Sequence, residues 1–549
     1  MDGTNAFGDF RAARDVLLKH RLDHDAAVRE FRWPRFSTFN WALDWFDRIA
    51  RGNDREALRI VAPGADQVRS YQELARRSDE VASWLRARGV GPGEPVLVLL
   101  DNRAELWELL LALMKLRAVI VPTFTTIGRD ELASRMHRAS VRHVVAEAGI
   151  AAGWGSLPEP QVRVSVGGPV PGWSDFDDSD GPGAFEPDGP TAPDEPLFHY
   201  FTSGTTARPK LVVHSHTSYA VGHLASMYWN GLQPGDVHLN VAPPGWAKHP
   251  WSSLFAPWNA EASLVSLPGA SSAHRILDAL ERTGATSFCA SPSTWRALLR
   301  AGAADRTVRL REAVSVGEPL TREIVDQVRE AWGVRVRNGY GQSEVTAIAG
   351  VAPGLDGDPT ELGRPLPGYD LVLCEPGSER PGREGELCVD LTANPVGMMR
   401  GYLDGPTPGG AAAMYRTGDL ARWDGSGGLL FLGRLKDVRH GADGSRISPP
   451  ELEAVLLEHP AVSETAVLVL DEPGREPVLK AFVVPAECWN ATSVTAEALF
   501  AHTRGRPTPG IDVVEFVDDL PRTESGKTHR DALRAYSRPA LLEFRRSAE

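Results

Sequence analysis

A cluster of small hydroxyl side chains follows an apolar run before residue 210. The run from Leu197 to Phe201 is apolar and aromatic, which predicts a buried strand. The turn after it consists of Thr202, Ser203, Gly204, Thr205 and Thr206, with Lys210 following Pro209. Such a turn exposes backbone N–H groups and hydroxyls on one side, which suits a polyphosphate. The spacing is not that of a Walker A loop, and a polar loop between strands explains the stretch equally well when it is taken alone.

The turn resembles the phosphate-binding signature Thr-Ser-Gly-Thr-Thr-Gly-x-Pro-Lys of the adenylate-forming superfamily, which includes acyl- and aryl-CoA synthetases. One residue departs from this pattern, because Ala207 stands where the family has glycine. If the position needs a positive φ, Ala207 carries backbone strain. The resemblance covers nearly all of the chain from Tyr71 on, and it implies that the turn and Lys210 bind the phosphates of ATP.

A second signature of the superfamily consists of Asn338, Gly339, Tyr340, Gly341, Gln342, Ser343 and Glu344. The resemblance implies that Tyr340 stacks on adenine and that Ser343 hydrogen-bonds phosphate, while the glycines let the backbone approach an acyl-adenylate. A carboxylate such as Glu344 supplies a hard oxygen ligand for Mg²⁺. A glycine turn with a surface glutamate is the weaker alternative, given the other signatures.

Three further segments complete the implied nucleotide site. Asp419, presented by a Thr-Gly turn, can accept hydrogen bonds from both ribose hydroxyls, and Arg434 is placed to contact ribose or phosphate. The segment that lies along the adenine in the family corresponds to Gly317, Glu318 and Pro319. Near the end of the chain, the family's catalytic lysine corresponds to Lys527. The implied catalytic residues are therefore Lys527, Glu344 and Thr202.

The acid substrate is expected to bind near Trp246. In the superfamily the segment that matches residues 245–251 lines the carboxylate pocket, and the implied lining residues here are Trp246, Lys248, His249, Gly317 and Gly339. Lys248 and His249 are unusual in an apolar wall. Either they point to solvent, which we take as the more ordinary case, or they meet a polar substituent of the substrate. An isolated buried lysine would need a partner.

The bulk composition is that of an ordinary soluble protein. The chain has 549 residues with 42% hydrophobic and 24% charged residues, so we expect at least two domains. The net charge of −13 argues against a nucleic-acid groove or an anionic membrane surface as partner. Four scattered cysteines form no metal-ligand or disulfide pattern. No signal peptide or transmembrane helix is expected, and we predict a cytoplasmic monomer or homodimer.

The elements that position these residues alternate between helix and strand. We predict helices over 71–88 and 103–116 and strands over 95–100 and 118–122, a pattern of βαβ units around a parallel sheet. Residues 152–196 are rich in Gly, Pro, Asp and Ser, and we expect a mobile, partly disordered connection there.

The resemblance also implies how the chain divides. The fold class is α/β, with packed sheets and a β-barrel-like subdomain in a large N-terminal domain (1–435). A small α+β C-terminal domain (436–549) rotates about a hinge at Lys436. Within it, a helix is expected to start near Ser448, with strands over 464–470 and 478–484.

The implied activity is activation of a carboxylic acid by ATP and Mg²⁺, with release of pyrophosphate and formation of an acyl-adenylate. Transfer to CoA is the expected second step, as in acetyl- and medium-chain acyl-CoA synthetases. The loop after the hinge, His440 to Arg446, has one residue more than the family pattern, and Ser445 replaces an aromatic residue. A carrier-protein thiol, an amine, or nitrite activated for an aryl amine therefore remain alternative acceptors. A degenerate nucleotide-binding protein without activity is the non-enzyme alternative.

Overall fold

The computed structural model describes residues 5–181, 184–202, 209–269, 271–405, 413–440, 446–470, 477–504, 506, 509–523, 528–535 and 542–546. These residues form two compact units. The larger unit comprises Met1–Leu320, Ile324–Asp370 and Asp390–Ala413, and the smaller comprises Thr321–Glu323, Leu371–Val389 and Met414–Glu549. The predicted boundary at residue 436 stays a prediction.

One sheet of the larger unit carries the phosphate turn. Its eight strands, in spatial order, are β19 (Gly401–Tyr402), β9 (Leu211–Ser215), β8 (Pro196–Phe201), β4 (Val119–Pro122), β3 (Pro95–Leu99), β5 (His143–Glu147), β6 (Val162–Val166) and β7 (Ser174–Asp175). From β8 to β7 neighbouring strands are parallel, whereas β9 pairs antiparallel with both β8 and β19. The predicted parallel arrangement is confirmed, with an antiparallel edge where the turn lies.

The second sheet of the larger unit carries the residues of the second signature. Its nine strands, in spatial order, are β16 (Arg364–Pro365), β15 (Ala347–Gly350), β14 (Val336–Gly341), β13 (Glu312–Val316), β12 (Ser287–Ala290), β10 (Val237–Asn240), β11 (Ser263–Ser266), β1 (Glu56–Ile60) and β2 (Gln67–Ser70). The strands from β14 to β1 are parallel, and the outer pairs are antiparallel. Of the second signature, Asn338 to Gly341 lie within β14, and Gln342 to Glu344 follow it.

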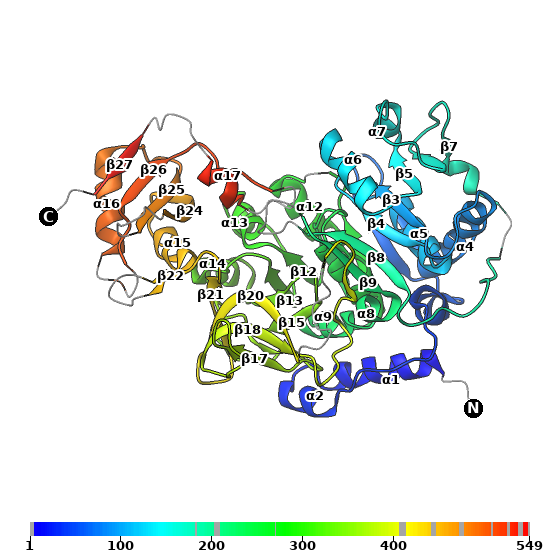
Figure 1. Ribbon diagram of the computed structural model, residues 1–549, viewed down its shortest axis with the longest axis horizontal. Helices are drawn as coiled ribbons and strands as arrows, with labels where there is room; N and C mark the ends of the chain where they lie inside the picture. Colours follow the sequence, from blue (N-terminus) through cyan, green and yellow to red (C-terminus); the bar gives the residue numbers. More distant parts are fainter. Residues whose placement is uncertain are drawn as a thin grey trace. The chain divides into compact units, whose positions relative to one another are not determined.

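Two helices that pack against each other show why the sequence folds locally as predicted. Helix α4 (Tyr71–Ala87) begins with a capping box in which Ser70 and Glu73 exchange hydrogen bonds. In helix α5 (Ala104–Lys115) every residue except Glu105 is buried, as expected for a helix that packs on both sides. α5 packs against α4 and β4 (Figure 1). Both helices and the strands β3 and β4 agree with the predicted bounds to within one residue.

The expectation of a mobile connection over 152–196 was wrong. β6 pairs in parallel with β5, β7 pairs with β6, and a short 3₁₀ helix, η2 (Phe176–Ser179), follows. The reason is the period-two pattern Val162-Arg-Val-Ser-Val166, whose valines are buried while Arg163 is half-buried. The surrounding Gly, Pro and Asp residues hid this short strand.

The smaller unit contains two four-stranded sheets and a hairpin. The first sheet has the order β17 (Leu371–Cys374), β18 (Glu384–Asp390), β20 (Met414–Trp423), β21 (Leu429–Arg434), and the second has the order β24 (Val462–Leu470), β25 (Val478–Pro485), β26 (Val513–Phe516), β27 (Glu543–Arg545). The hairpin pairs β22 (Arg439–His440) with β23 (Arg446–Ile447). Helices α15 (Pro449–Leu457) and α16 (Ser493–Thr503) contribute to the core beneath the second sheet. The predicted helix start at Ser448 is confirmed, since this residue caps α15.

Among the helices that the structure describes, none is long and apolar enough to cross a membrane.

Candidate functional site

The base of the predicted phosphate turn is a closed hairpin. The Thr202 N–H donates to the Lys210 carbonyl at 2.9 Å, and the Lys210 N–H donates to the Thr202 hydroxyl at 3.3 Å. Phe201 and Leu211 pair across β8 and β9 just below. Ser203, Gly204, Thr205, Thr206 and Ala207 lie outside the described residues. The strands thus hold the two ends of the turn together, and its contact with phosphate stays a prediction.

A tyrosine connects the lysine of the turn to the predicted magnesium ligand. The Tyr402 hydroxyl donates to Oε1 of Glu344 at 2.8 Å and accepts a hydrogen bond from Nζ of Lys210 at 3.4 Å. The Lys210 ammonium also lies 4.6 Å from the centre of the Tyr402 ring. Because β19 pairs with β9, Tyr402 lies opposite Val212, two residues after Lys210. The structure therefore brings Lys210 and Glu344 together through a residue to which the sequence analysis gave no role.

The exit of the turn is held by a second set of contacts. The Arg138 guanidinium, at the end of α6 (Arg129–Arg138), contacts both the Pro209 carbonyl and the Asp404 carboxylate. The other oxygen of Asp404 accepts from the Leu211 N–H at 3.4 Å. Arg138 and Asp404 carried no motif; the pairing of β19 with β9 brings Asp404 here, and Arg138 comes from the end of α6. Their contacts with Pro209 and Leu211 hold the backbone on both sides of Lys210 in place.

The glycines of the second signature have a packing reason. A Cβ atom on Gly339 would lie 2.3–2.6 Å from atoms of the Trp229 indole, and one on Gly341 would lie 2.4 Å from the Trp251 ring. The Trp229 indole donates to the Asn338 carbonyl at 3.0 Å, which fixes it against the strand. Close packing thus explains these glycines without a ligand, and the predicted pocket role of Gly339 stays a prediction.

The rest of the second signature is held in place by neighbouring elements. The Ser343 carbonyl accepts a hydrogen bond from Nε2 of the buried His214 at 2.7 Å. The Gln342 amide donates to the Tyr340 hydroxyl at 3.1 Å. Glu344 is half-buried, and its backbone carbonyl accepts from the Met399 N–H at 2.8 Å. These contacts within the chain hold the segment in place.

The segment predicted to lie along adenine forms a turn after β13. Gly317 is exposed with a φ of +102°, a conformation that favours glycine. The Glu318 carboxylate accepts from the Ser293 N–H at 3.1 Å and from its hydroxyl at 3.2 Å, at the first turn of α13 (Pro292–Arg300). Pro319 is exposed. Glu318 thus holds the turn to a helix, and its contact with adenine stays a prediction.

Lys248 and His249 do not point to solvent, so the more ordinary of the two alternatives was wrong. Lys248 is 5% exposed and His249 is 1% exposed. Nε2 of His249 lies 3.0 Å from the amide oxygen of Asn102, and burial lowers the pKa of His249 to about 3, so the ring is neutral. The Lys248 ammonium lies 5.4 Å from the centre of the half-buried Trp246 ring.

The predicted ribose-binding residues lie in the smaller unit and face each other. Asp419 on β20 is directly opposite Arg434 on β21, and the Arg434 Nε lies 2.9 Å from Oδ1 of Asp419. The Asp419 side chain is only 2% exposed, whereas that of Arg434 is 39% exposed. The Asp419 N–H donates to the Thr417 hydroxyl, which donates in turn to the Leu387 carbonyl. The carboxylate is therefore rigidly placed beside a cation.

Of the predicted hinge and the predicted catalytic lysine, the structure describes only the hinge. Lys436 lies in an exposed turn after β21, where its carbonyl accepts from the Arg439 guanidinium at 2.6 Å. Lys527 and residues 441–445 lie outside the described part of the chain. Arg522 and Thr528 pair on either side of the segment that contains Lys527. The hinge and catalytic roles stay predictions.

The donor set at Glu344 is compatible with Mg²⁺ when a nucleotide is bound. The described residues contain no group of three or more His, Cys, Asp or Glu side chains able to hold a metal. A single carboxylate suits Mg²⁺ because this ion keeps several waters and takes its other ligands from substrate phosphates. Glu344 could hold it in this way.

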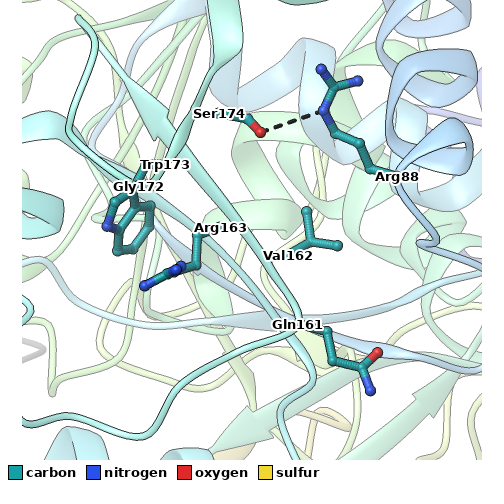
Figure 2. Close-up of a pocket in the computed structure, with 7 residues that line it drawn as sticks. All are labelled: Arg88, Gln161, Val162, Arg163, Gly172, Trp173 and Ser174. Atoms are coloured by element: carbon teal, nitrogen blue, oxygen red, sulfur yellow. Dashed lines mark hydrogen bonds between the residues drawn. The ribbon is translucent and has the colours of Figure 1, made fainter.

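A surface hollow elsewhere contains none of the predicted site residues. It lies at the β6–β7 edge and is lined by Arg88, Gln161, Val162, Arg163, Gly172, Trp173 and Ser174 (Figure 2). Nε of Arg88 donates to the Ser174 hydroxyl at 3.4 Å, and the Arg163 guanidinium donates to the Glu159 carboxylate at 2.8 Å, so both guanidinium groups of the hollow already have partners. It is not the site that the sequence predicts.

Comparisons with known proteins agree with this geometry. Residues 45–403 match the family model described as AMP-binding enzyme, and residues 451–527 match the AMP-binding enzyme C-terminal domain. The chain is 34% identical to 4-hydroxybutyrate--CoA ligase 1 of Metallosphaera sedula over 90% of each chain. It is 30% identical to the mitochondrial acyl-coenzyme A synthetase ACSM3 of Mus musculus over 96% of this chain and 95% of that one.

A solved structure supports the architecture. The anthranilate CoA ligase AuaEII in complex with anthranoyl-AMP superposes with a TM-score of 0.81 at 24% identity, covering 91% of this chain and 97% of that one. At this identity the likeness concerns the fold alone. It confirms the predicted α/β class with a large N-terminal and a small C-terminal domain.

Proposed function

The chain belongs to the family of AMP-binding, adenylate-forming enzymes, and we propose that it activates a carboxylic acid with ATP and transfers the acyl group to coenzyme A. The observation that carries the proposal is the group formed by Lys210, Tyr402 and Glu344 at the base of the phosphate turn. At this position the Lys210 ammonium suits the negatively charged phosphates of a nucleotide, and the Glu344 carboxylate suits the Mg²⁺ that accompanies them.

In the first half-reaction a carboxylate oxygen of the acid attacks the α-phosphorus of ATP. The new O–P bond forms as the bond to the bridging oxygen breaks, and pyrophosphate leaves with the electron pair. Lys210, the turn N–H groups and Lys527 stabilise the charge that builds on the phosphate oxygens. Mg²⁺, when held by Glu344, supplies charge neutralisation for the phosphates.

Asp419 and Arg434 bind the ribose in this scheme. The carboxylate of Asp419 accepts hydrogen bonds from the ribose hydroxyls, and the half-exposed Arg434 holds that carboxylate and reaches the nucleotide. The cross-strand pair thereby orients the nucleoside while the reacting phosphorus faces the acid.

In the second half-reaction the CoA thiol, as thiolate, attacks the acyl carbonyl of the adenylate, and AMP leaves with the electron pair of the broken C–O bond. Rotation of the C-terminal domain about Lys436 removes Lys527 and presents a second surface. The relatives named as CoA ligases do not favour a carrier protein, an amine or nitrite as acceptor. A cytoplasmic monomer or homodimer remains part of the proposal.

The test is product analysis with ATP, Mg²⁺, a panel of carboxylic acids and CoA. We expect pyrophosphate and AMP with the correct acid, and stoichiometric acyl-CoA by mass spectrometry. AMP without acyl-CoA would overturn CoA as acceptor, and no pyrophosphate with any acid would overturn the activity. A Lys527→Ala variant should lose about 10²–10³-fold in adenylation while it converts isolated acyl-AMP normally. The exposed Lys19, which pairs with Glu30, provides the matched control Lys19→Ala.

A further inference from the structure

In the part of the chain that the structure describes, buried cationic side chains are paired with carboxylates, with one exception. Among the described residues, six Lys or Arg side chains are classed as buried: Arg14, Arg77, Lys115, Arg135, Lys248 and Arg337. Five of these six have a carboxylate partner at 3.3 Å or less: Arg14 with Glu261, Arg77 with Glu108, Lys115 with Asp79, Arg135 with Glu131 and Arg337 with Glu312. Lys248 has none among the described residues.

The described residues around Lys248 offer an aromatic face but no carboxylate in salt-bridge contact with its ammonium. Its ammonium lies 5.4 Å from the Trp246 ring centre, which compensates only part of the cost of removing the charge from water. His249 beside it is neutral and bonded to Asn102. Burial, with a smaller contribution from the Lys248 charge, lowers the pKa of His238 to about 3, so this group is neutral as well. A largely buried ammonium that has no carboxylate partner among the described residues can be neutralised by an anion that a ligand brings.

The position of Lys248 in the fold points to the acid substrate as the source of that anion. Lys248 begins the helical run α10 (Lys248–Pro250), which continues as the π-helix η3 (Trp251–Phe255). Residues three apart share a helix face, and Trp251, three residues after Lys248, packs on Gly341 of β14. The Tyr219 hydroxyl fixes the preceding backbone by donating to the Ala247 carbonyl at 2.6 Å. Lys248 is thus held one helical turn from Trp251, the residue that packs on the second signature at Gly341.

We propose that Lys248 binds a second anionic group of the acid substrate, so that this enzyme prefers a carboxylic acid bearing a distal carboxylate or similarly charged substituent. This inference rests on the proposed acid activation and narrows its substrate class. The distal anion neutralises the buried ammonium, while the other carboxylate of the acid attacks ATP. A plain acid of the same length leaves the ammonium unpaired and binds less well for that reason.

The experiment compares matched acids in the intact enzyme. Glutarate is paired with pentanoate, and terephthalate with 4-methylbenzoate, so that each pair differs in one carboxylate. Pyrophosphate release with ATP and Mg²⁺ gives kcat/KM for each acid in the wild type and in Lys248→Met and Lys248→Gln. We expect the wild type to prefer the diacid of at least one pair, and the ratio of diacid to monoacid kcat/KM to fall about 100-fold in Lys248→Met.

Thermal unfolding of the ligand-free protein provides a readout independent of activity. Lys248→Met removes an unpaired buried charge, so its Tm should equal or exceed that of the wild type. The matched control is Lys115→Met, which leaves Asp47 and Asp79 without their shared cation and should lower the Tm. A Lys248→Met variant that loses as much stability as Lys115→Met would overturn the proposal, because Lys248 would then have a structural partner.

The kinetic outcomes separate this proposal from the proposed activity. If monoacids are activated and Lys248→Met lowers kcat/KM equally for the two acids of each pair, Lys248 acts on the reacting carboxylate. The proposal then fails while the proposed activity stands. If no acid releases pyrophosphate, the activity fails. In that case the binding of glutarate and terephthalate to the wild type and to Lys248→Met is measured by calorimetry. Binding that is absent from both proteins, or equally strong in both, would overturn the proposed anion site at Lys248.

Discussion

At the scale of single residues, the group Lys210, Tyr402 and Glu344 combines three chemical roles near the ends of three strands, β9, β19 and β14. The ammonium is exposed and suited to phosphate, the carboxylate is half-buried and suited to Mg²⁺, and the phenol between them orients both. A hydroxyl that donates to a carboxylate restricts its rotamers, so the ligand is positioned before the metal arrives. Tyr402 is therefore a positioning residue in this scheme.

The variant Tyr402→Phe tests that role. It keeps the ring that contacts the Lys210 ammonium at 4.6 Å and removes the hydroxyl that bonds Glu344. We expect the Mg²⁺ concentration for half-maximal pyrophosphate release to rise about two- to ten-fold, the value of one hydrogen bond, with a smaller effect on the KM for the acid. The control is Tyr71→Phe, whose hydroxyl bonds the Ala262 carbonyl elsewhere in the unit. An unchanged Mg²⁺ dependence in Tyr402→Phe would refute the positioning role.

Replacing the buried carboxylate of the smaller unit tests the ribose assignment. Asp419→Ala should raise the Kd for ATP about ten- to a hundred-fold, because hydrogen bonds to a charged group contribute about 1.5–3 kcal/mol. Asp424→Ala is the control, since the Asp424 side chain bonds Ser426 and Gly428 in the turn after the same strand. Equal Kd values for the wild type and Asp419→Ala, measured by calorimetry, would remove Asp419 from the nucleotide site.

At the scale of elements, β14 depends on glycine because aromatic rings of neighbouring helical segments lie against its backbone. Gly339 and its cross-strand partner Gly350 both face the indole of Trp229, from helix α9 (His223–Asn230). A side chain at either position would push the helix away from the strand. The signature that marks the nucleotide site in the sequence is thus also a packing requirement of the sheet.

Gly339→Ala measures that requirement. The new Cβ would lie 2.3 Å from the indole, and overpacking of this kind costs about 1–3 kcal/mol. The control is Gly149→Ala in α7 (Ala148–Ala152), where nothing lies within 4 Å of the new atom, and there we expect about 0.4–1 kcal/mol of stabilisation. Urea unfolding gives both values. If Gly339→Ala retains wild-type stability but loses ATP binding, the glycine serves the ligand instead.

The elements that the sequence predicted correctly carry their own local signals. Helix α4 has a capping box and α5 a continuous apolar run, so their bounds follow from nearby residues. Strand β6 was missed because its five residues are surrounded by residues typical of loops. The burial of Lys248 and the contact between Lys210 and Tyr402, which are 192 residues apart, arise only from tertiary packing and strand pairing. Motif spacing identifies the site, but it does not show which charges inside it lack partners.

At the scale of the whole molecule, the described part of the larger unit contains six buried histidines whose pKa burial lowers strongly. Burial lowers the pKa of His199, His214 and His216 to about 4, that of His238 and His249 to about 3, and that of His223 well below its ordinary value. In the unfolded chain these rings titrate near pH 6.5. Between pH 6.5 and about 4 the unfolded chain therefore binds more protons than the folded one, so stability is present above this window and is lost as the pH falls through it.

We accordingly expect the urea midpoint of the larger unit to fall steadily from pH 7.5 to pH 5. Each additional proton bound on unfolding changes the free energy of unfolding by about 1.4 kcal/mol per pH unit. Paired carboxylates lose their contribution at lower pH, so the histidines dominate this window. His216→Phe isolates one of them, since neither ring nitrogen of His216 has a hydrogen-bond partner in the described part of the chain. Besides burial, Glu195 raises and Arg117 lowers its pKa. In His216→Phe, the slope of the free energy of unfolding against pH should correspond to up to one proton fewer. A wild-type midpoint that does not change with pH would contradict this account of acid sensitivity. A slope in His216→Phe identical to that of the wild type would contradict it as well.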